Sequence, residues 1–227
     1  MKPDLIVSWP RHMDYPLWRQ VIHEERGRFA KVIVVLTNMN VNKDYSNFIK
    51  KAMRVDGITF FMISPAEAEE DWRDMAIKGA LKESNAPWIF FTEQDFFWNT
   101  GFWECVSEQE SKYGYIVGMV GERVHPCCIF LKRNVLNKTS KDFGVIRDVS
   151  DHFSRIQNDL ANEPRFEIPQ DLWFHFGGLS QNMFLLMNGS KELYLPQDFA
   201  NYVKACQKVT VPMHDDFLKV FNSYEVL

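Results

Sequence analysis

The sequence predicts an α/β protein with a mainly parallel central sheet flanked by helices and with antiparallel additions in its second half. Apolar runs such as KVIVVL (31–36) and ITFFMI (58–63) alternate with helical patterns over the first hundred residues. This alternation is typical of βαβ units whose strands are buried on both faces. Two later runs, at 115–120 and 127–131, follow each other closely, which favours antiparallel pairing.

Each strand and helix follows from its own local pattern. In the first half we expect strands at 5–7, 31–36, 58–63 and 88–91, separated by helices at 17–29, 45–55 and 66–83. These helices show apolar residues at the spacing of one helix face. The third is acidic at its start and basic later, as the helix dipole favours. In the second half we expect helices at 101–110, 133–136, 149–160 and 196–209 around the two close strands.

Composition and charge exclude several classes of protein. The chain has 227 residues, 46% of them hydrophobic and 25% charged, so it is globular and long enough for a substantial core. Its net charge of −4 gives no broad footprint for nucleic acid. The four cysteines lack CxxC spacing, so we expect buried thiols in a reducing compartment and neither a zinc site nor a disulfide framework. No run is long enough to span a bilayer and no signal peptide is recognisable, so we expect a cytoplasmic protein.

An acidic pair ends the strand predicted at 88–91. Glu93 and Asp95 stand one residue apart, and Phe96, Phe97 and Trp98 follow directly. Two carboxylates at the mouth of an apolar strand repel each other, and a divalent cation would offset that cost. The alternative is an ordinary acidic turn.

In an open parallel sheet, ligands bind beyond the carboxyl ends of the strands. The polar loops 8–11, 37–40, 64–65 and 92–95 should therefore gather at one edge and form a nucleotide-sized cleft. No GxGxxG and no GxxxxGK[ST] follows any predicted strand, which argues against dinucleotide dehydrogenases and P-loop NTPases.

This order of elements, the acid-x-acid pair and the strand CCIFLKRNVL that runs into a short helix resemble the GT-A glycosyltransferases, of the glycosyltransferase 2-like, nucleotide-diphospho-sugar transferase type. The resemblance implies a Rossmann-like GT-A fold in a single domain over 1–227. Residues 1–100 would bind the nucleotide sugar, and residues 101–227 would bind the acceptor. It also implies a hexosyl- or pentosyltransferase that moves a sugar from a nucleoside-diphosphate sugar, with a UDP-sugar as the expected donor, to a hydroxyl acceptor. The family's Asp-x-Asp is Glu93-Gln94-Asp95 here, so the first acid departs from the pattern.

The resemblance also assigns roles to residues. Asp95 and Glu93 would hold Mn²⁺ or Mg²⁺, with a late histidine, His175 in HFGG or His214 in MHDD, completing the shell. An inverting enzyme needs a general base, for which Asp151 is the first choice and Asp159 and Asp171 are further candidates. The residues expected to contact the donor are Ser8, Pro10, Arg11, Asn38, Ser64, Glu93 and Gln94.

Simpler interpretations stay open for several of these residues. His175 would also suit a core histidine packed among aromatic residues, and His214 a solvated loop. Asp151 would also suit an acid at a helix start.

Two other functions stay open as well. A nucleotidyltransferase would use a similar metal and phosphate site, although a Gly/Lys/Arg-rich phosphate loop near the N-terminus is absent. A transferase-like scaffold without catalysis would bind a partner or a saccharide only. The acceptor would be a saccharide, a lipid-linked glycan, a protein or a modified nucleic-acid base. A basic cluster at Lys132, Arg133, Lys138 and Lys141 leaves the nucleic-acid acceptor open, and a solvated basic face is the simpler interpretation.

Overall fold

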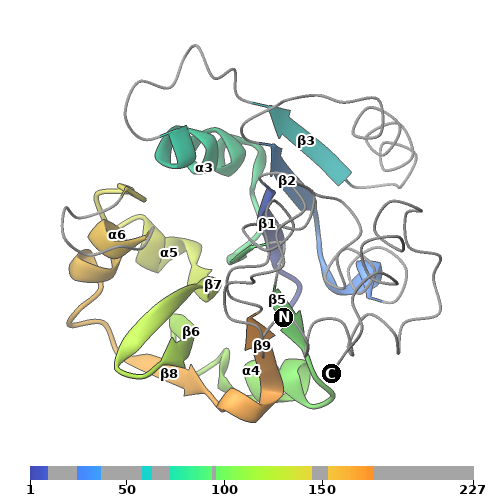
Figure 1. The fold of residues 1–227 in the computed structure, drawn as a ribbon, viewed down its shortest axis with the longest axis vertical. Coiled ribbons are helices and arrows are strands. Elements are labelled where there is room, and N and C mark those ends of the chain that lie inside the picture. Colours follow the sequence, from blue (N-terminus) through green and yellow to red (C-terminus); the bar gives the residue numbers. More distant parts are fainter. Residues whose placement is uncertain (10–24, 37–57, 63–71, 94–95, 145–152, 176–227) are drawn as a thin grey trace, which may run out of the picture.

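A seven-stranded sheet forms the centre of the protein, for which the computed structural model describes residues 1–9, 25–36, 58–62, 72–93, 96–144 and 153–175. Its strand order is β3-β2-β1-β4-β7-β6-β8 (Figure 1). The strands of its first half are β1 (Asp4–Trp9), β2 (Val32–Leu36), β3 (Ile58–Met62) and β4 (Trp88–Glu93). Those of its second half are β6 (Tyr115–Val120), β7 (Arg123–Lys132) and β8 (Arg165–Ile168).

The pairing of these strands confirms the predicted fold class. Strands β3, β2, β1 and β4 are mutually parallel, as expected from alternating strands and helices. Strand β7 is antiparallel to both β4 and β6, so the two close strands β6 and β7 supply the predicted antiparallel pairing. Because β8 is parallel to β6, the strands β4, β6 and β8 all run in the same direction. Within the described sheet, only β7 runs against the others.

One face of the sheet packs against helices. These are α3 (Trp72–Glu83), α5 (Arg133–Leu136) and α6 (Ser154–Asp159), on one side of the sheet in Figure 1. Alternate strand residues such as Ile33, Ile89 and Ile129 meet Ala76 and Ala80 of α3 in one buried cluster. Successive side chains of a strand point to opposite faces, so this cluster takes half of each buried run.

Aromatic side chains form the core of the other face. The rings of Phe90 and Phe130 are stacked with centroids 4.0 Å apart across the β4–β7 pair. Phe102 and Trp103 of helix α4 (Phe102–Gln109) pack onto this pair, each with ring centroids within 6.3 Å of Phe90. Trp98 also joins them. The high aromatic content of the sequence is therefore used in a second core layer.

A two-stranded sheet lies beside this aromatic layer and was not predicted. It pairs β5 (Phe96–Trp98) with β9 (Trp173–His175), which the short 3-10 helix η4 (Gln170–Leu172) precedes. Both strands have three residues, which is too short for a recognisable period. Strand β8 was also missed, because its alternation is weak and Pro169 follows it.

The described part of the helix predicted at 149–160 is α6. Phe153 has φ of 66°, a left-handed conformation that interrupts a helix, so α6 starts at Ser154. Of the predicted helix at 17–29, the described end contains the 3-10 helix η2 (Arg26–Arg28). The helices predicted at 45–55 and 196–209 lie outside the described residues.

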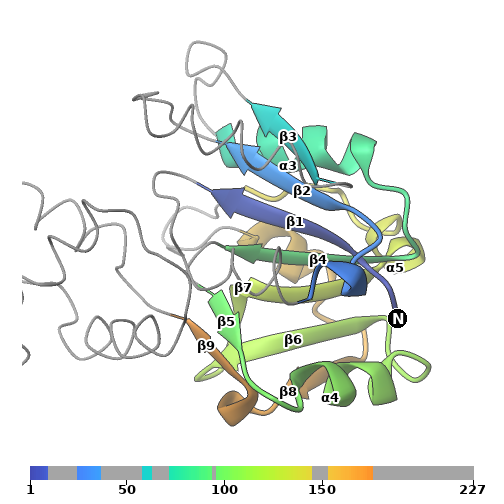
Figure 2. The ribbon, with the colours of Figure 1, turned by 90° about the vertical axis from the view of Figure 1, so that its right-hand side faces the viewer.

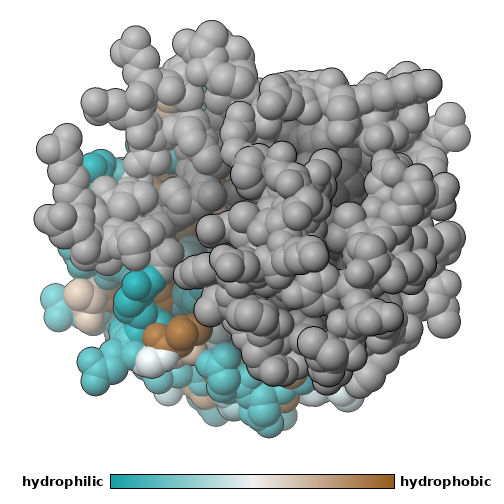
Figure 3. All heavy atoms as spheres, in the orientation of Figure 1, coloured by the Kyte–Doolittle hydropathy of each residue, from teal (hydrophilic) through white to brown (hydrophobic). Residues whose placement is uncertain are grey.

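The described surface is mainly hydrophilic on the face that Figure 3 shows, apart from one small hydrophobic area. The large apolar side chains exposed in the described residues are Met75, Val120 and Phe174, which lie on three different elements. Isolated apolar residues of this kind are normal on a protein surface. Among the described helices, none has the length and apolar character needed to cross a membrane.

Candidate functional site

The carboxyl ends of β1, β2 and β4 lie along one edge of the sheet, and the β5–β9 pair lies at the same edge (Figure 2). Ser8 of β1 is in register with Glu93, the last residue of β4. Since β7 is antiparallel to β4, its first residues lie at this edge as well. Residues that are far apart in the sequence therefore meet here, as the parallel topology predicts.

Glu93 and His175 lie next to each other at this edge. The Oε2 atom of Glu93 is 3.9 Å from Nε2 of His175, and both side chains are partly buried. His175 is also the ladder partner of Phe96, the residue that follows Asp95 in the chain. Glu93 and Phe96, the described residues on either side of 94–95, are therefore both placed beside His175. A carboxylate and an imidazole are two of the ligand types that first-row divalent metals accept, so this pair fits a metal site.

A bulge in β7 brings two further side chains to His175. Val117 of β6 pairs with Ile129 and Met119 with Val124, so two steps along β6 correspond to five along β7. The extra residues include His125, Pro126 and Cys127. Proline has no N–H to donate to a ladder, which suits a bulge, and bulges often redirect side chains beside functional sites. His125, Cys127 and His175 each bring one ligand atom within 4.8 Å of the other two.

Phe143 and Phe153, which flank the segment 145–152 that contains Asp151, both pack near β4. Phe153 donates its N–H to the carbonyl of Phe143 over 3.1 Å. The rings of Phe143 and Phe153 lie 5.6 Å and 5.2 Å from that of Phe91, which is two residues before Glu93. The chain thus leaves and rejoins the described structure close to the acidic strand end.

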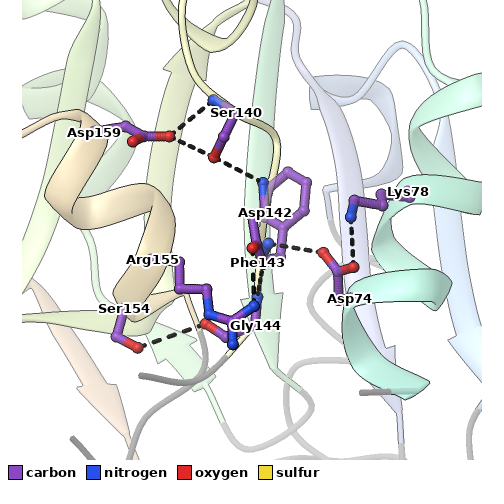
Figure 4. Close-up of polar contacts among 9 residues, drawn as sticks. All are labelled: Asp74, Lys78, Ser140, Asp142, Phe143, Gly144, Ser154, Arg155 and Asp159. Atoms are coloured by element: carbon purple, nitrogen blue, oxygen red, sulfur yellow. Dashed lines mark hydrogen bonds and ion pairs between the residues drawn. The ribbon is translucent and has the colours of Figure 1, made fainter. Parts of the chain in front are cut away.

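Hydrogen bonds join the chain around Phe143 to the helices α3 and α6 (Figure 4). Asp74 of α3 accepts a hydrogen bond from the N–H of Phe143 over 2.8 Å. Asp159 of α6 accepts from both the N–H and the hydroxyl of Ser140, over 2.8 Å and 2.6 Å. Burial pushes the pKa of Asp142 upward, but the N–H of Gly144 and the guanidinium of Arg155 outweigh it and hold that pKa below its usual range.

The predicted site residues divide into two groups. Ser8, Glu93 and His175 are described, and all three lie at the predicted edge. The further candidates Asp159 and Asp171 lie elsewhere: Asp159 ties α6 to Ser140, and Asp171 belongs to η4. The remaining predicted residues, Pro10, Arg11, Asn38, Ser64, Gln94, Asp95, Asp151 and His214, lie outside the described residues.

Two residues of the basic cluster, Lys132 and Arg133, lie at the other end of the sheet. Lys132 pairs with Trp88, which begins β4, and its ammonium stands 5.1 Å from the centroid of that ring. Arg133 donates to the carbonyl of Ala86 and to the hydroxyl of Ser84. These two cations therefore support the amino end of β4 and lie a strand's length from Glu93.

Sequence analysis missed His125 and Cys127 as candidate ligands. Cys127 is buried, as predicted, but it was interpreted as a plain core thiol. The His-x-Cys spacing was the available signal, and it is weak because only the bulge and β9 bring the third ligand close. Burial raises the pKa of the neighbouring Cys128 thiol well above its usual range, as expected for an inert core cysteine.

Comparison with known proteins supports the fold. A scan of protein-family profiles and a search of curated proteins found no match to the sequence. Among solved structures, the chain is similar to mannosyltransferase PcManGT from Pyrobaculum calidifontis in complex with GDP-Man and Mn2+. The TM-score is 0.54 at 12% identity, covering 98% of this chain and 69% of that one.

Two further solved structures agree with this likeness. HddC from Yersinia pseudotuberculosis gives a TM-score of 0.54 at 12% identity, covering 91% of this chain and 99% of that one. Glucosyl-3-phosphoglycerate synthase from Mycobacterium tuberculosis, in complex with Mn2+, UDP and glucosyl-3-phosphoglycerate, gives 0.52 at 11% identity, covering 84% and 81%. The chain therefore has the Rossmann-like fold of the GT-A, nucleotide-sugar glycosyltransferases.

Proposed function

We propose that the protein is a glycosyltransferase that moves a hexosyl or pentosyl group from a nucleoside-diphosphate sugar to a hydroxyl acceptor. The observation that carries this proposal is the pairing of Glu93 with His175, 3.9 Å apart, at the carboxyl edge of a GT-A-type sheet. Ligands of open α/β sheets bind at that edge. The solved relatives bound to GDP-Man with Mn2+ and to UDP with Mn2+ support the same type of donor here.

Asp95, Glu93 and a histidine, either His175 or His214, would hold Mn²⁺ or Mg²⁺ in this protein. Breaking the bond between the sugar and the diphosphate leaves negative charge on the departing nucleoside diphosphate, and the bound cation supplies positive charge there. Ser8 is in register with Glu93 and would lie beside the donor. We assign donor contacts also to Pro10, Arg11, Asn38, Ser64 and Gln94, which follow the parallel strands or lie between the two acids.

The acceptor hydroxyl must lose its proton as it attacks the sugar. In an inverting enzyme a carboxylate takes this proton as general base. We assign this role to Asp151, because Phe143 and Phe153, which flank its segment, pack on Phe91, two residues before Glu93. The acceptor would be a saccharide or another hydroxyl compound. The net charge of −4 and the position of Lys132 and Arg133 at the amino end of β4 give less support to a nucleic-acid acceptor.

The experiment incubates the full chain with Mn²⁺ and a panel of nucleoside-diphosphate sugars, with UDP-sugars first, and measures released nucleoside diphosphate. Asp95→Asn should lower the rate at least about a hundredfold, because a cation's contribution of several kcal/mol is lost. Glu83→Gln is the matched control, since Glu83 is an exposed acid at the end of α3, before the amino end of β4.

The products separate the competing functions. Release of nucleoside diphosphate supports glycosyl transfer, whereas release of pyrophosphate would mean nucleotidyl transfer. No binding of any nucleoside diphosphate with Mn²⁺ in calorimetry would favour a scaffold without catalysis. A rate in Asp95→Asn equal to that of the wild type would contradict the role of the acid pair.

A further inference from the structure

Two histidines and a cysteine form a cluster at the carboxyl edge of the sheet. One ligand atom from each of His125, Cys127 and His175 lies within 4.8 Å of the other two. The rings of His125 and His175 have centroids 4.1 Å apart. We propose that these three residues form a zinc-binding site, which shares His175 with the candidate ligands of the donor cation.

The chemistry of the three ligands selects the metal. A cysteine thiolate and two imidazoles are the borderline-soft donors that zinc takes in proteins, whereas Mn²⁺ and Mg²⁺ prefer carboxylate, carbonyl and water oxygens. The described part of the cluster offers one sulfur and two nitrogens. This set therefore differs in kind from the carboxylates that would hold the cation of a nucleotide sugar.

The geometry is close to that of a zinc site. In tetrahedral coordination with ordinary Zn–N and Zn–S bonds, ligand atoms lie roughly 3.3–3.6 Å apart. The separations of up to 4.8 Å close with side-chain movements of about 1 Å. The backbone N–H of Cys127 is directed at Nδ1 of His125 over 3.3 Å. In a neutral imidazole the nitrogen that accepts this bond carries the only free lone pair, so zinc would bind Nδ1 of His125 in place of the Cys127 N–H while Nε2 keeps its proton.

The backbone has brought these ligands together from two sheets. His125 and Cys127 belong to the bulged part of β7 in the seven-stranded sheet, and His175 ends β9 in the two-stranded sheet. A zinc ion on these three residues would join β9 to the large sheet at the donor edge. Coordination would also release the thiol proton of Cys127, since the thiolate is the ligand.

Glu93 adds a carboxylate to the surroundings of the cluster. Its Oε2 atom is 3.9 Å from Nε2 of His175. Carboxylates next to a metal-binding histidine orient its ring and strengthen it as a ligand, and their loss typically lowers metal affinity about 10–100-fold. Three protein ligands leave one coordination position for water.

The test measures metal binding to the full chain after dialysis against a chelator. Calorimetry should give one Zn²⁺ per chain, bound at least about a hundredfold more tightly than Mn²⁺, and zinc should raise the melting temperature. Replacing zinc by Co²⁺ should give a thiolate charge-transfer band. Cys127→Ser should remove that band and weaken zinc binding at least about tenfold. Loss of a residue that only supports a metal ligand already lowers metal affinity about 10–100-fold, and the loss of a ligand itself should cost at least as much.

Cys105→Ser is the matched control, because Cys105 is a free, partly buried cysteine of α4 outside the cluster. It should keep both the band and the affinity. If Cys127→Ser does not fold, His125→Gln takes its place, since His125 is less buried, and it should weaken zinc binding to the same extent. Zinc bound no more tightly than Mn²⁺, or full zinc affinity in both Cys127→Ser and His125→Gln, would overturn the proposal.

This inference does not depend on the proposed glycosyl transfer. Asp95→Asn should abolish transfer and leave zinc binding intact, whereas Cys127→Ser should lose zinc. Zinc binding without any transfer activity would support the zinc site and count against the proposed function. Transfer activity in a protein that fails to bind zinc would support the proposed function and count against the zinc site.

Discussion

The substitution Gly118→Ala would show whether the close packing of Trp173 on β6 supports the candidate site. A Cβ atom at this position of β6 would lie 2.6 Å and 2.7 Å from two ring carbons of Trp173 and 2.9 Å from Cβ of Cys128. Ordinary contacts begin at 3.4 Å, so the Trp173 ring would have to move by at least 0.8 Å, the difference between 3.4 Å and 2.6 Å. Trp173 is fully buried and packs on Phe96, which leaves it little room.

We therefore expect Gly118→Ala to lower stability by about 1–3 kcal/mol, which is the usual cost of overpacking. For a chain of this length the melting temperature should fall by about 2–12 °C. Because Trp173 lies two residues before His175 in β9, the change should also weaken zinc binding. Differential scanning calorimetry measures the first effect and titration calorimetry the second.

Two comparisons make this prediction refutable. Gly27→Ala is the control, because a Cβ there meets no atom within 4 Å, and its stability should change by no more than about 0.5 kcal/mol. Trp173→Phe should relieve part of the clash, so the double variant should be more stable than the sum of the single effects by at least about 0.5 kcal/mol. A Gly118→Ala protein that melts with the wild type would refute the close packing.

Two further predictions concern the carboxylates of Asp4 and Asp142. Asp4→Ala should lower stability in urea by about 3–5 kcal/mol, because buried Asp4 accepts hydrogen bonds from the Ser84 hydroxyl and the N–H groups of Asn85 and Ala86, and these donors would lose their partner. An equal urea midpoint for wild type and variant would contradict this. The pKa of Asp142 is held low in the folded protein, so its contribution is present above the unfolded pKa of about 4 and is lost as pH falls through the folded pKa. Asp142→Asn should therefore lose less stability than the wild type on acidification, and parallel curves of stability against pH would count against it.

Local sequence patterns predicted the central sheet well. The runs at 31–36 and 58–63 are β2 and β3 to within a residue or two, because continuous β-branched and aromatic residues suit a strand buried on both faces. Helices 101–110 and 133–136 were also found, as α4 and α5. Periodicity needs length, so the three-residue strands β5 and β9 left no recognisable signal. The left-handed Phe153 was missed because glycine is the usual marker of that conformation.

The candidate site was predictable only in part. Glu93 could be placed because it ends a strong strand signal, and parallel strands bring their carboxyl ends together. Its position beside His175 follows from the β5–β9 pair, which has no local signature. The approach of His125 and Cys127 to His175 could not be predicted either. It depends on a register shift of three residues between β6 and β7, which involves two strands and leaves no pattern in one of them.

The sequence by itself determined the fold class, the four strands of the first half and the acidic end of β4. It could do so because burial on two faces and alternation with helices are written into local residue patterns. Only the tertiary structure decided that Glu93 meets His175, that a bulge brings His125 and Cys127 to them, and that Lys132 and Arg133 lie at the far end of the sheet. These contacts join segments up to 82 residues apart, from 93 to 175, and such proximity depends on packing that no local pattern contains.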